Sequence, residues 1–413
     1  MLRNMKLLRA ATVLTSPTAD PIGGGEVLVD GDTIAAVGPR GGVEVGDDVA
    51  IVDLPHHTLM AGLIDCHVHT GFTRDRDPIT GHRAEPPARL ALRMAENARK
   101  LVSAGVTTAR DLGGRDFVDI ALRDAIAEGL TVGPNLLVAT RPITPGNGHC
   151  WYLGGAADSP DRIREVTREN LRAGADCLKI MASGGQLTPT AAAMWLPQFS
   201  ADDMRIVVSE AHACGKTVAA HAHSPEAIRR CLDAGVDTLE HCSFLTETGP
   251  AYDPELAARI ADAGTFVSPT VSGLFWKLRE FMGAQRMDTL LERVTRMHEA
   301  GVRLIAGTDC GFKLKGVDNS ADLFVTSLEV LEHAGLSRRE VLEAATVTAA
   351  AACGLGGVTG SITAGHRADL IAVDGNPLND LASLRRLDLV MVAGRAVTQS
   401  TVDTAAVSSA VLG

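Results

Sequence analysis

Two patterns of hydrophobic positions alternate through the middle of the chain. Short apolar runs rich in β-branched residues are each followed by an amphipathic stretch. Several of these stretches open on Ser or Asp, then Pro and an acid, and end at Gly, as in residues 159–174, 224–235 and 253–264. Such an opening provides an N-cap, a proline at the first helical position and a negative charge at the positive end of the helix dipole, while glycine suits the left-handed C-cap. The amphipathic stretches are therefore predicted to be helices and the apolar runs to be strands.

Eight apolar runs are predicted to be strands. They cover residues 63–69, 106–111, 135–140, 177–182, 217–223, 238–241, 265–270 and 302–309. Strands that alternate with helices in this way are typical of the α/β class, and eight of them indicate a (β/α)8 TIM barrel. In that fold the functional residues lie at the C-terminal ends of the strands.

The two ends of the chain follow a third pattern, in which short strands are separated by glycine. Strands are predicted at residues 7–15, 25–30, 33–37 and 49–53, and again at 368–373 and 387–392. Neither segment is large enough to bury a core alone. We predict that residues 1–58 and 356–413 pair into one discontinuous β-sandwich, with the barrel formed by residues 59–355.

Composition narrows the class of partner. The chain has 413 residues, a formal net charge of −11 and no basic tract, so we expect no nucleic-acid partner. No apolar stretch is long enough to span a bilayer, and the first ten residues are a poor signal peptide. Eight scattered cysteines are interpreted as reduced thiols. We expect a cytoplasmic protein without a membrane partner, acting on a small-molecule or peptide substrate as a monomer or homo-oligomer.

Side chains that commonly bind metals are predicted at the strand ends. His67 and His69 project from the same face of the first strand, because side chains alternate along a strand. His221, His241 and Asp309 lie at the ends of the fifth, sixth and eighth strands. Four imidazoles and a carboxylate at one rim form a ligand set suited to Zn²⁺ and similar ions.

Lys179 is the unusual member of this set. It lies in the fourth strand between apolar neighbours, where an ammonium is costly to bury and would repel divalent cations. Taken singly, Lys179 can also be a snorkelling side chain and Asp309 a turn or helix-cap residue. His221 can be a core histidine, and His223 competes with it as the ligand. The joint arrangement at the strand ends of one barrel favours a metal site.

Candidates for substrate binding come from the loops. Trp195, Phe275 and Trp276 lie after the fourth and seventh predicted strands, and only 3% of the chain is aromatic. This concentration indicates an apolar pocket or lid, with packing of the loops on the barrel as the alternative. Three basic residues are candidate partners for a substrate carboxylate, with a solvated surface position as the alternative: Arg141, Arg74 and Lys277.

The chain resembles the amidohydrolase superfamily over nearly its whole length. The matching parts are residues 60–69, 105–111, 240–241, 307–309 and 360–370, together with Lys179 and His221. Within the superfamily the chain is most similar to the imidazolonepropionase-related group, which contains Xaa-Pro and Xaa-Arg dipeptidases and ochratoxin-type amidases. Residues 145–149 and 178–185 carry this closer similarity.

The resemblance implies a centre of two divalent metal ions, with Zn²⁺ as the expected ion. A carbamate, formed from CO₂ on the lysine, would bridge the ions. The implied ligands are His67, His69, the carbamate of Lys179 and Asp309 for one ion, and the carbamate, His221 and His241 for the other. A hydroxide between the ions would attack the scissile carbonyl, and Asp309 would act as general base and then as general acid.

The resemblance also implies roles for two further histidines. In those dipeptidases the histidine that matches His149 helps to hold the substrate near its carboxylate. His223 stands where they commonly have a tyrosine. His149 and His223 are therefore candidate catalytic and substrate-binding residues, which either bind a substrate carboxylate or stabilise the oxyanion.

We predict a binuclear metal-dependent amidohydrolase that cleaves an amide bond in a peptide, an N-acyl amino acid or a modified peptide. The last class includes ribosomal peptide natural products (RiPP-type substrates), as in the bottromycin pathway. One alternative is a cyclic-amide hydrolase or deaminase of imidazolonepropionase type. Metal-dependent deaminases usually lack the bridging lysine, so Lys179 favours hydrolysis. The other alternative is a non-catalytic binding protein on the same scaffold, and the complete set of six ligands argues against it.

Overall fold

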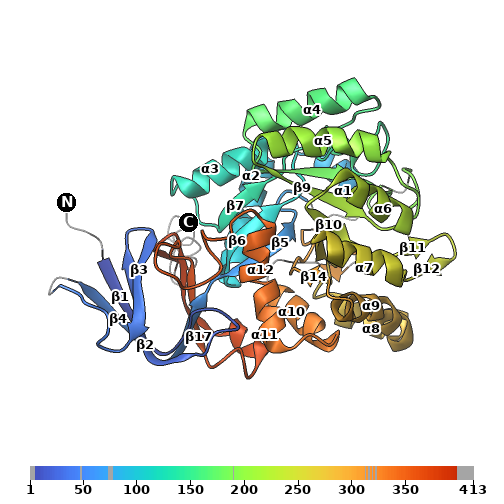
Figure 1. The fold of residues 1–413 in the computed structure, drawn as a ribbon. Helices are drawn as coiled ribbons and strands as arrows, with labels where there is room; N and C mark the ends of the chain where they lie inside the picture. The colour runs from blue at the N-terminus through green and yellow to red at the C-terminus, as the bar shows by residue number, and fades with distance from the viewer. Residues whose placement is uncertain are drawn as a thin grey trace, which may run out of the picture.

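Figure 1 shows the computed structural model, which describes residues 5–46, 49–72, 78–188, 190–311, 313–314, 317–318, 320 and 323–397. Strands from the two chain ends lie on one side of the molecule. The alternating strands and helices from the middle of the chain form the larger part beside them. The strands of the two chain ends and the alternating strands and helices are therefore distinct regions of the structure.

Eight inner strands correspond one to one with the eight predicted strands. They are β5 (Leu63–Val68), β6 (Val106–Asp111), β7 (Asn135–Val138), β8 (Cys177–Met181), β9 (Thr217–Ala222), β10 (Thr238–His241), β13 (Phe266–Ser268) and β14 (Arg303–Leu304). All neighbouring pairs are parallel, in one sheet of order β5-β6-β7 and another of order β8-β9-β10-β13-β14. β13 is shorter than predicted because Pro269 follows it, and proline has no N–H to continue the ladder.

Hydrogen bonds link the two inner sheets at both of their edges. After β7, the backbone N–H of Ile143 donates to the carbonyl of Lys179 in β8 at 2.8 Å. After β14, the N–H of Asp309 donates to the carbonyl of His67 in β5 at 2.8 Å. A parallel bridge between Val68 and Cys310 lies at the same edge. These links bring the C-terminal ends of β5, β8 and the segment after β14 to the same side of the structure.

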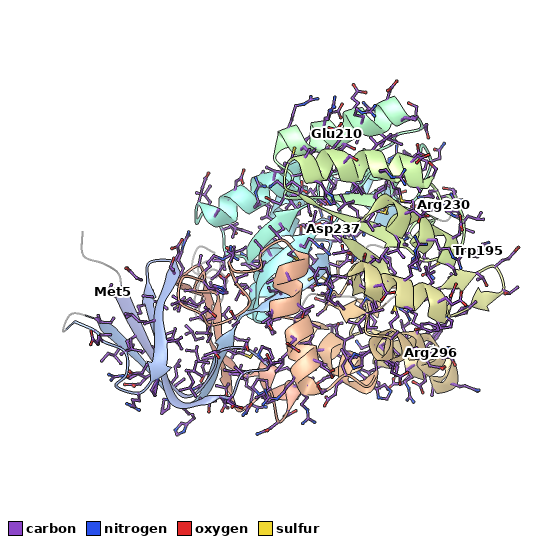
Figure 2. All side chains as sticks on the ribbon, viewed as in Figure 1. Met5, Trp195, Glu210, Arg230, Asp237 and Arg296 are labelled. Carbon is purple, nitrogen blue, oxygen red and sulfur yellow. The ribbon has the colours of Figure 1, made fainter. Side chains whose placement is uncertain are left out.

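The helices follow the strands, and three of them begin and end at the caps that the sequence marks, at residues 159–174, 224–235 and 253–264. The helices are α1 (Pro78–Ala84), α2 (Pro87–Ser103), α3 (Val118–Ala127), α4 (Pro160–Ala173), α5 (Ala201–Ala213), α6 (Pro225–Ala234), α7 (Pro254–Ala263), α8 (Phe275–Met282), α9 (Ala284–Glu299), α10 (Phe324–His333), α11 (Arg338–Ala344) and α12 (Val347–Ala352). The Ser159 side chain accepts a hydrogen bond from the N–H of Arg162, and Gly174 ends α4 with φ 102°. Figure 2 shows charged side chains on the outer helices, where Glu210 of α5 accepts two 2.8 Å bonds from Arg168 of α4.

Strands from the two chain ends pair with one another. These strands are β1 (Met5–Leu14), β2 (Ile22–Asp30), β3 (Thr33–Pro39), β4 (Ala50–Ala61), β17 (Leu370–Asp374), β18 (Leu387–Val392) and β19 (Arg395–Val397). Hydrogen bonds join them into one seven-stranded sheet of order β19-β18-β17-β4-β1-β2-β3. The junction is the antiparallel pair of β4 and β17. Side chains alternate along a strand. Those of Leu370 and Ala372 therefore pack in the hydrophobic cluster of the terminal strands, while those of Ile371 and Val373 pack against the larger part.

The remaining elements are short. They are the hairpins β11 (Leu245–Thr246) with β12 (Gly249–Pro250) and β15 (Lys313–Leu314) with β16 (Val317–Asp318), and the 3₁₀ turns η1 (Trp151–Leu153) and η3 (Leu381–Arg385). All eight cysteines are free thiols, as predicted, and only Cys214 is exposed. Across the described part of the chain, no helix is both long enough and apolar enough to cross a bilayer.

Candidate metal centre

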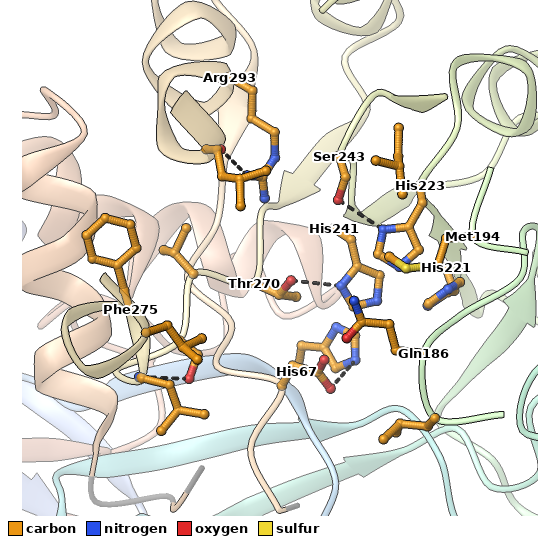
Figure 3. A pocket seen from close by; sticks show the side chains of 18 of the residues that line it. His67, Gln186, Met194, His221, His223, His241, Ser243, Thr270, Phe275 and Arg293 are labelled. Atoms are coloured by element: carbon orange, nitrogen blue, oxygen red, sulfur yellow. Dashed lines mark hydrogen bonds and ion pairs between the residues drawn. The ribbon is translucent and has the colours of Figure 1, made fainter. Parts of the chain in front are cut away.

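The C-terminal ends of the inner strands border a cavity of about 830 Å³. Figure 3 shows histidine side chains from several strands gathered at this cavity, among them His67, His221 and His241. Lys179 and Asp309 also line it. The structure therefore brings together the residues that the sequence places on five separate strand ends.

His67, His69 and Asp309 form the first potential ligand group. The Oδ1 atom of Asp309 lies 3.5 Å from Nε2 of His67 and 3.2 Å from Nε2 of His69. The two Nε2 atoms are 3.3 Å apart. All three residues offer ligand atoms within 4.8 Å of one another, a spacing that could hold one metal ion.

His221, His223 and His241 form a second potential ligand group, again with ligand atoms within 4.8 Å of one another. The ring centroids of His221 and His241 are 4.5 Å apart, and the His223 ring stacks on the His241 ring at 4.6 Å. The two groups are adjacent, since the ring centroids of His67 and His241 are 5.3 Å apart. His223, the alternative to His221 as the predicted metal ligand, thus lies beside His221 in the structure.

Lys179 lies beside both groups. Its side chain is 1% exposed, and its Nζ atom has no hydrogen-bond partner among the described residues. Burial lowers the pKa of Lys179 to about 8, so an appreciable share of the amine is neutral near pH 8. A buried lysine nitrogen without a partner is costly as an ammonium. It fits a lysine that is converted to a carbamate, because the modified side chain would be an anion that could act as a metal ligand.

The backbone at three strand ends adopts an unusual conformation. His241 has φ 70°, Thr270 has φ 48° and Asp309 has φ 50°, all in the left-handed region. Residues with a Cβ rarely adopt this region, and the strain of order 1 kcal/mol or more must be offset by the surrounding structure. Here Thr270 Oγ1 lies 2.8 Å from Nδ1 of His241, so two of the strained residues hold each other in place. Strain of this kind is concentrated at functional sites.

A buried charge network orients His67. Its Nδ1 atom lies 2.8 Å from Oε2 of Glu240, and the Arg110 guanidinium donates to Oε1 of Glu240 at 2.9 Å. Burial alone would raise the pKa of Glu240, but Arg110 and His67 hold it at about 2, so the carboxylate is charged. The carboxylate therefore favours the tautomer of His67 with the proton on Nδ1 and the lone pair on Nε2, which faces Asp309.

His149 and His223 both line the cavity, as the sequence predicts for substrate-contacting residues. The His149 ring lies 4.6 Å from the His221 ring, centroid to centroid. Burial, reinforced by the charge of Lys179, lowers the pKa of His149 to about 3. Burial and the neighbouring His149 likewise lower the pKa of His223 to about 3. Both imidazoles are therefore neutral at pH 7.

Arg141 is not part of the described cavity lining. Its guanidinium donates to Glu169 at 2.8 Å and to Asn170 at 3.1 Å, and lies over the Phe117 ring at 4.6 Å. These partners on α4 and before α3 direct the side chain away from the strand ends. The companion candidate Arg74 falls outside the described residues.

Trp195 and Trp276 are also not among the described lining residues. Trp195 lies at the edge of the molecule in the view of Figure 2, and its neighbour Met194 lines the cavity instead. Trp276 is half-buried, with its ring 5.0 Å from that of His333, while the preceding Phe275 lines the cavity. Met194 thus lines the cavity in place of Trp195, and of the predicted pair Phe275 and Trp276 only Phe275 lines it.

Several cavity residues escape the sequence reasoning. Helices α8 and α9 supply an apolar wall, and polar groups join it from loops and from α9: Leu278, Met287, Leu290, Leu291, Gln186, Ser243 and Arg293. The helical residues follow the ordinary spacing of an amphipathic helix, which does not tell a core-facing residue from a cavity-facing one.

The parallel strands, the two potential ligand groups and the buried lysine define an α/β protein with a candidate metal centre at its strand ends. Comparison with known proteins gives the particular family: the chain belongs to the amidohydrolase family, whose model matches residues 58–397. Ochratoxinase of Aspergillus niger is 28% identical over 368 residues, covering 78% of this chain and 71% of that protein. Imidazolonepropionase of Acidiphilium cryptum is 27% identical over 402 residues, covering 89% and 91%. A crystal structure of a Xaa-Pro dipeptidase with bound methionine in the active site has a TM-score of 0.84 and 26% identity, covering 95% of this chain and all of that one (100%).

Proposed function

We propose that this protein is a binuclear metal-dependent amidohydrolase that cleaves an amide bond in a peptide, an N-acyl amino acid or a modified peptide. The observation that carries the proposal is the pair of adjacent ligand groups beside the unpartnered Nζ of Lys179. His67, His69 and Asp309 would hold one ion, His221 and His241 the other, and a carbamate on Lys179 would bridge them. Imidazole and carboxylate ligands of this kind suit Zn²⁺.

When bound, the two ions would polarise the scissile carbonyl and lower the pKa of the attacking water toward about 7. Asp309 would accept the proton from the nucleophile and transfer it to the leaving nitrogen. Glu240 would keep His67 in the ligand tautomer throughout. The neutral His149 and His223 would donate hydrogen bonds to the developing oxyanion or to a nearby carboxylate.

The cavity supports a substrate with an apolar part. Phe275, Leu278 and Met287 line it from α8 and α9, and Figure 3 shows Phe275 across the cavity from the histidines. The dipeptidase of similar fold binds methionine in its active site, and two relatives are named ochratoxinase and imidazolonepropionase. These names support hydrolysis of a carbon–nitrogen bond next to an apolar group. The relatives named imidazolonepropionase keep the cyclic-amide substrate as the second candidate.

Three features of the architecture belong to the same proposal. The eight linked inner strands would form a complete (β/α)8 barrel within residues 59–355. The terminal sheet from residues 1–58 and 356–413 would make up the accompanying β-sandwich. The observed β4 continues to Ala61, so this strand would pass directly from the terminal sheet into the first barrel strand.

The test combines metal content with a substrate panel. Protein purified without chelator is expected to contain about two equivalents of Zn²⁺ or a similar ion by elemental analysis. The panel compares hydrophobic dipeptides and N-acyl amino acids with azoline-containing peptides, cyclic imides and imidazolones. We expect cleavage of linear amides next to an apolar group. Turnover confined to the ring substrates would replace the proposal by the second candidate, and a folded protein that binds no metal would refute it.

A further inference from the structure

Arg293 is a charged residue of the cavity that the proposed chemistry does not use. It lies on α9, and among the described lining residues it is the only basic side chain besides Lys179. The only acidic residue of that lining, Asp309, contacts His67 and His69. If the lysine is carbamylated, the guanidinium of Arg293 is the one remaining arginine or lysine charge among the described lining residues.

The hydrogen bonds of Arg293 do not satisfy its guanidinium. It donates to the backbone carbonyl of Leu290 and, at 3.2 Å, to that of Pro269. Its buried Nε atom has no partner in the part of the chain that the structure describes, and no carboxylate there forms an ion pair with it. A guanidinium has five N–H donors, so two carbonyl contacts leave about three of them without a partner among the described residues. Burial lowers the pKa of Arg293 to about 10, which still leaves it charged at neutral pH.

A partly buried cation without an anionic partner is unfavourable, since carbonyl dipoles replace only part of its hydration. A carboxylate entering the cavity would provide the missing charge and could accept two parallel hydrogen bonds from the planar guanidinium. Arg293 also lies on the same side of the cavity as Ser243 and His223, as Figure 3 shows, and these two are hydrogen-bonded at 2.9 Å.

The residues around Arg293 indicate the chemical character of the rest of the ligand. Leu290 and Leu291 precede it on α9, and with Met287 and Leu278 they form the apolar wall of the cavity. A carboxylate held by Arg293 would therefore have an apolar substituent within reach of this wall. A free amino-acid end with an apolar side chain combines both features in one residue.

We infer that Arg293 binds the free carboxylate of the residue released by hydrolysis, and that the enzyme is specific for amides of apolar amino acids with an unblocked carboxyl group. The inference rests on the proposed amide-hydrolase function and narrows its substrate class. It distinguishes N-acyl amino acids and C-terminal peptide bonds from internal peptide bonds and from amides of simple amines.

The first experiment measures turnover by the metal-loaded enzyme. N-acetyl-L-leucine is compared with N-acetylisoamylamine, which has the same amide and side chain but no carboxylate. For Arg293→Met we expect kcat/KM on the acid to fall by about 10- to 100-fold, with the amine derivative unchanged within about threefold. Arg293→Lys should recover part of the loss because it keeps the charge. Arg296→Met is the matched control, since Arg296 lies on the same helix over the Tyr252 ring at 4.0 Å and is not among the described lining residues.

The second experiment does not depend on turnover. Calorimetry measures binding of 4-methylpentanoate and of 4-methylpentanamide to the same metal-loaded variants. We expect the acid to bind the wild type more tightly than the amide, and this preference to disappear in Arg293→Met. If the acid binds equally to wild type and Arg293→Met, the carboxylate is held elsewhere and the inference is wrong. A further outcome is that binding follows the inference while neither N-acetyl-L-leucine nor N-acetylisoamylamine is hydrolysed. In that case the proposed function fails while the carboxylate site stands.

A structural role for Arg293 is separable from substrate binding. Loss of its contacts with Leu290 and Pro269 would lower the thermal midpoint and reduce turnover of both substrates together. Only carboxylate recognition changes the ratio between acid and amine derivative. An unchanged ratio in a folded Arg293→Met variant would overturn the inference.

Discussion

The Nδ1 atom of His67 lies 2.8 Å from a buried oxygen of Glu240, while the Nε2 atom on the other side of the ring faces Asp309 at 3.5 Å. The carboxylate thereby favours the tautomer in which Nε2 is unprotonated, so that its lone pair can coordinate a metal. Outer partners of this kind typically contribute 10- to 100-fold to metal affinity. Glu240 directly precedes His241 in the chain, yet it contacts His67 of another strand.

Glu240→Gln is expected to weaken metal binding by about 10- to 100-fold, measured by competition with a chelator. The substitution also leaves Arg110 without its buried anionic partner, so the free energy of unfolding should fall by about 3 kcal/mol or more. Glu240→Asp keeps the charge but shortens the reach to His67, and should recover stability more than metal affinity. Glu226→Gln, on the exposed side of α6, is the control. Unchanged affinity in a folded Glu240→Gln protein would contradict the orienting role.

Lys179→Ala removes the nitrogen that would carry the bridging carbamate. We expect the metal content to fall from about two equivalents per chain to one or none, and activity to fall with it. A short carboxylic acid added at high concentration should restore part of both, because its two oxygens can replace the carbamate. Lys277→Ala on α8 serves as the control, because this candidate carboxylate partner is not among the described lining residues of the cavity. Full metal content and activity in the alanine variant would show that Lys179 is only structural.

Asp309→Asn separates metal binding from proton transfer. The amide oxygen can still contact a metal but cannot carry a proton, so kcat should fall by about 10²-fold or more while part of the metal remains bound. The residual activity should also lose the limb of the pH–rate profile that Asp309 contributes. A profile of unchanged shape and height would exclude Asp309 from the reaction.

His82 provides a pH test outside the metal groups. Its ring lies 5.7 Å from that of Phe72, and burial, then the charge of Arg115, lowers its pKa from 6.5 to about 4. The unfolded chain takes up this proton below pH 6.5, whereas the folded protein does so only near pH 4. The contribution of His82 to stability is therefore complete above pH 6.5 and is lost as the pH falls to about 4.

The slope of the unfolding free energy against pH reports how many protons the chain takes up on unfolding. Over that pH range the slope for His82→Gln should correspond to about one proton fewer than for the wild type. Urea titrations of the metal-free proteins at several pH values measure this slope. The comparison between variants matters because the buried carboxyl of Asp65, with its pKa raised to about 7 by burial, has the opposite effect in both proteins. His212→Gln, on exposed α5, is the control. Equal slopes in His82→Gln and wild type would show that His82 is protonated normally in the folded state.

The strand ends and the histidines at them could be predicted because they depend on local rules, while the role of Lys179 and the choice of His221 over His223 rested on the resemblance to the amidohydrolase superfamily. His67 and His69 point the same way through the two-residue period of a strand, and proline, acid and glycine mark the helix boundaries on either side of each strand. The order of elements then places these ends at one rim. Nothing beyond the parallel α/β arrangement is needed to bring His221 and Asp309 near His67.

The substrate side of the cavity could not be predicted in the same way, because it depends on irregular segments and on long-range packing. In the loop after β8, Met194 lines the cavity and Trp195 does not, and no periodicity fixes which of two neighbouring loop residues faces inward. Arg141 donates hydrogen bonds to acceptors on α4. The sequence does not define how this helix packs beside Arg141. Arg293 lies in an ordinary amphipathic pattern, so only the structure distinguishes its inward position from a surface one.

The final prediction concerns His149, whose ring packs directly on Gly185. A Cβ added at Gly185 would lie 2.4 Å from the ring of His149, so Gly185→Ala must displace the ring, while Gly23→Ala in β2 meets nothing within 4 Å and serves as the control. If His149 mainly holds the substrate, both His149→Ala and Gly185→Ala remove binding that is equal in the ground and transition states. KM for an apolar N-acyl amino acid should then rise by about tenfold in His149→Ala, with kcat lowered less, and by a smaller factor in Gly185→Ala. Metal content should remain at the wild-type level in both variants. A large fall in kcat at unchanged KM would instead assign His149 to stabilisation of the oxyanion.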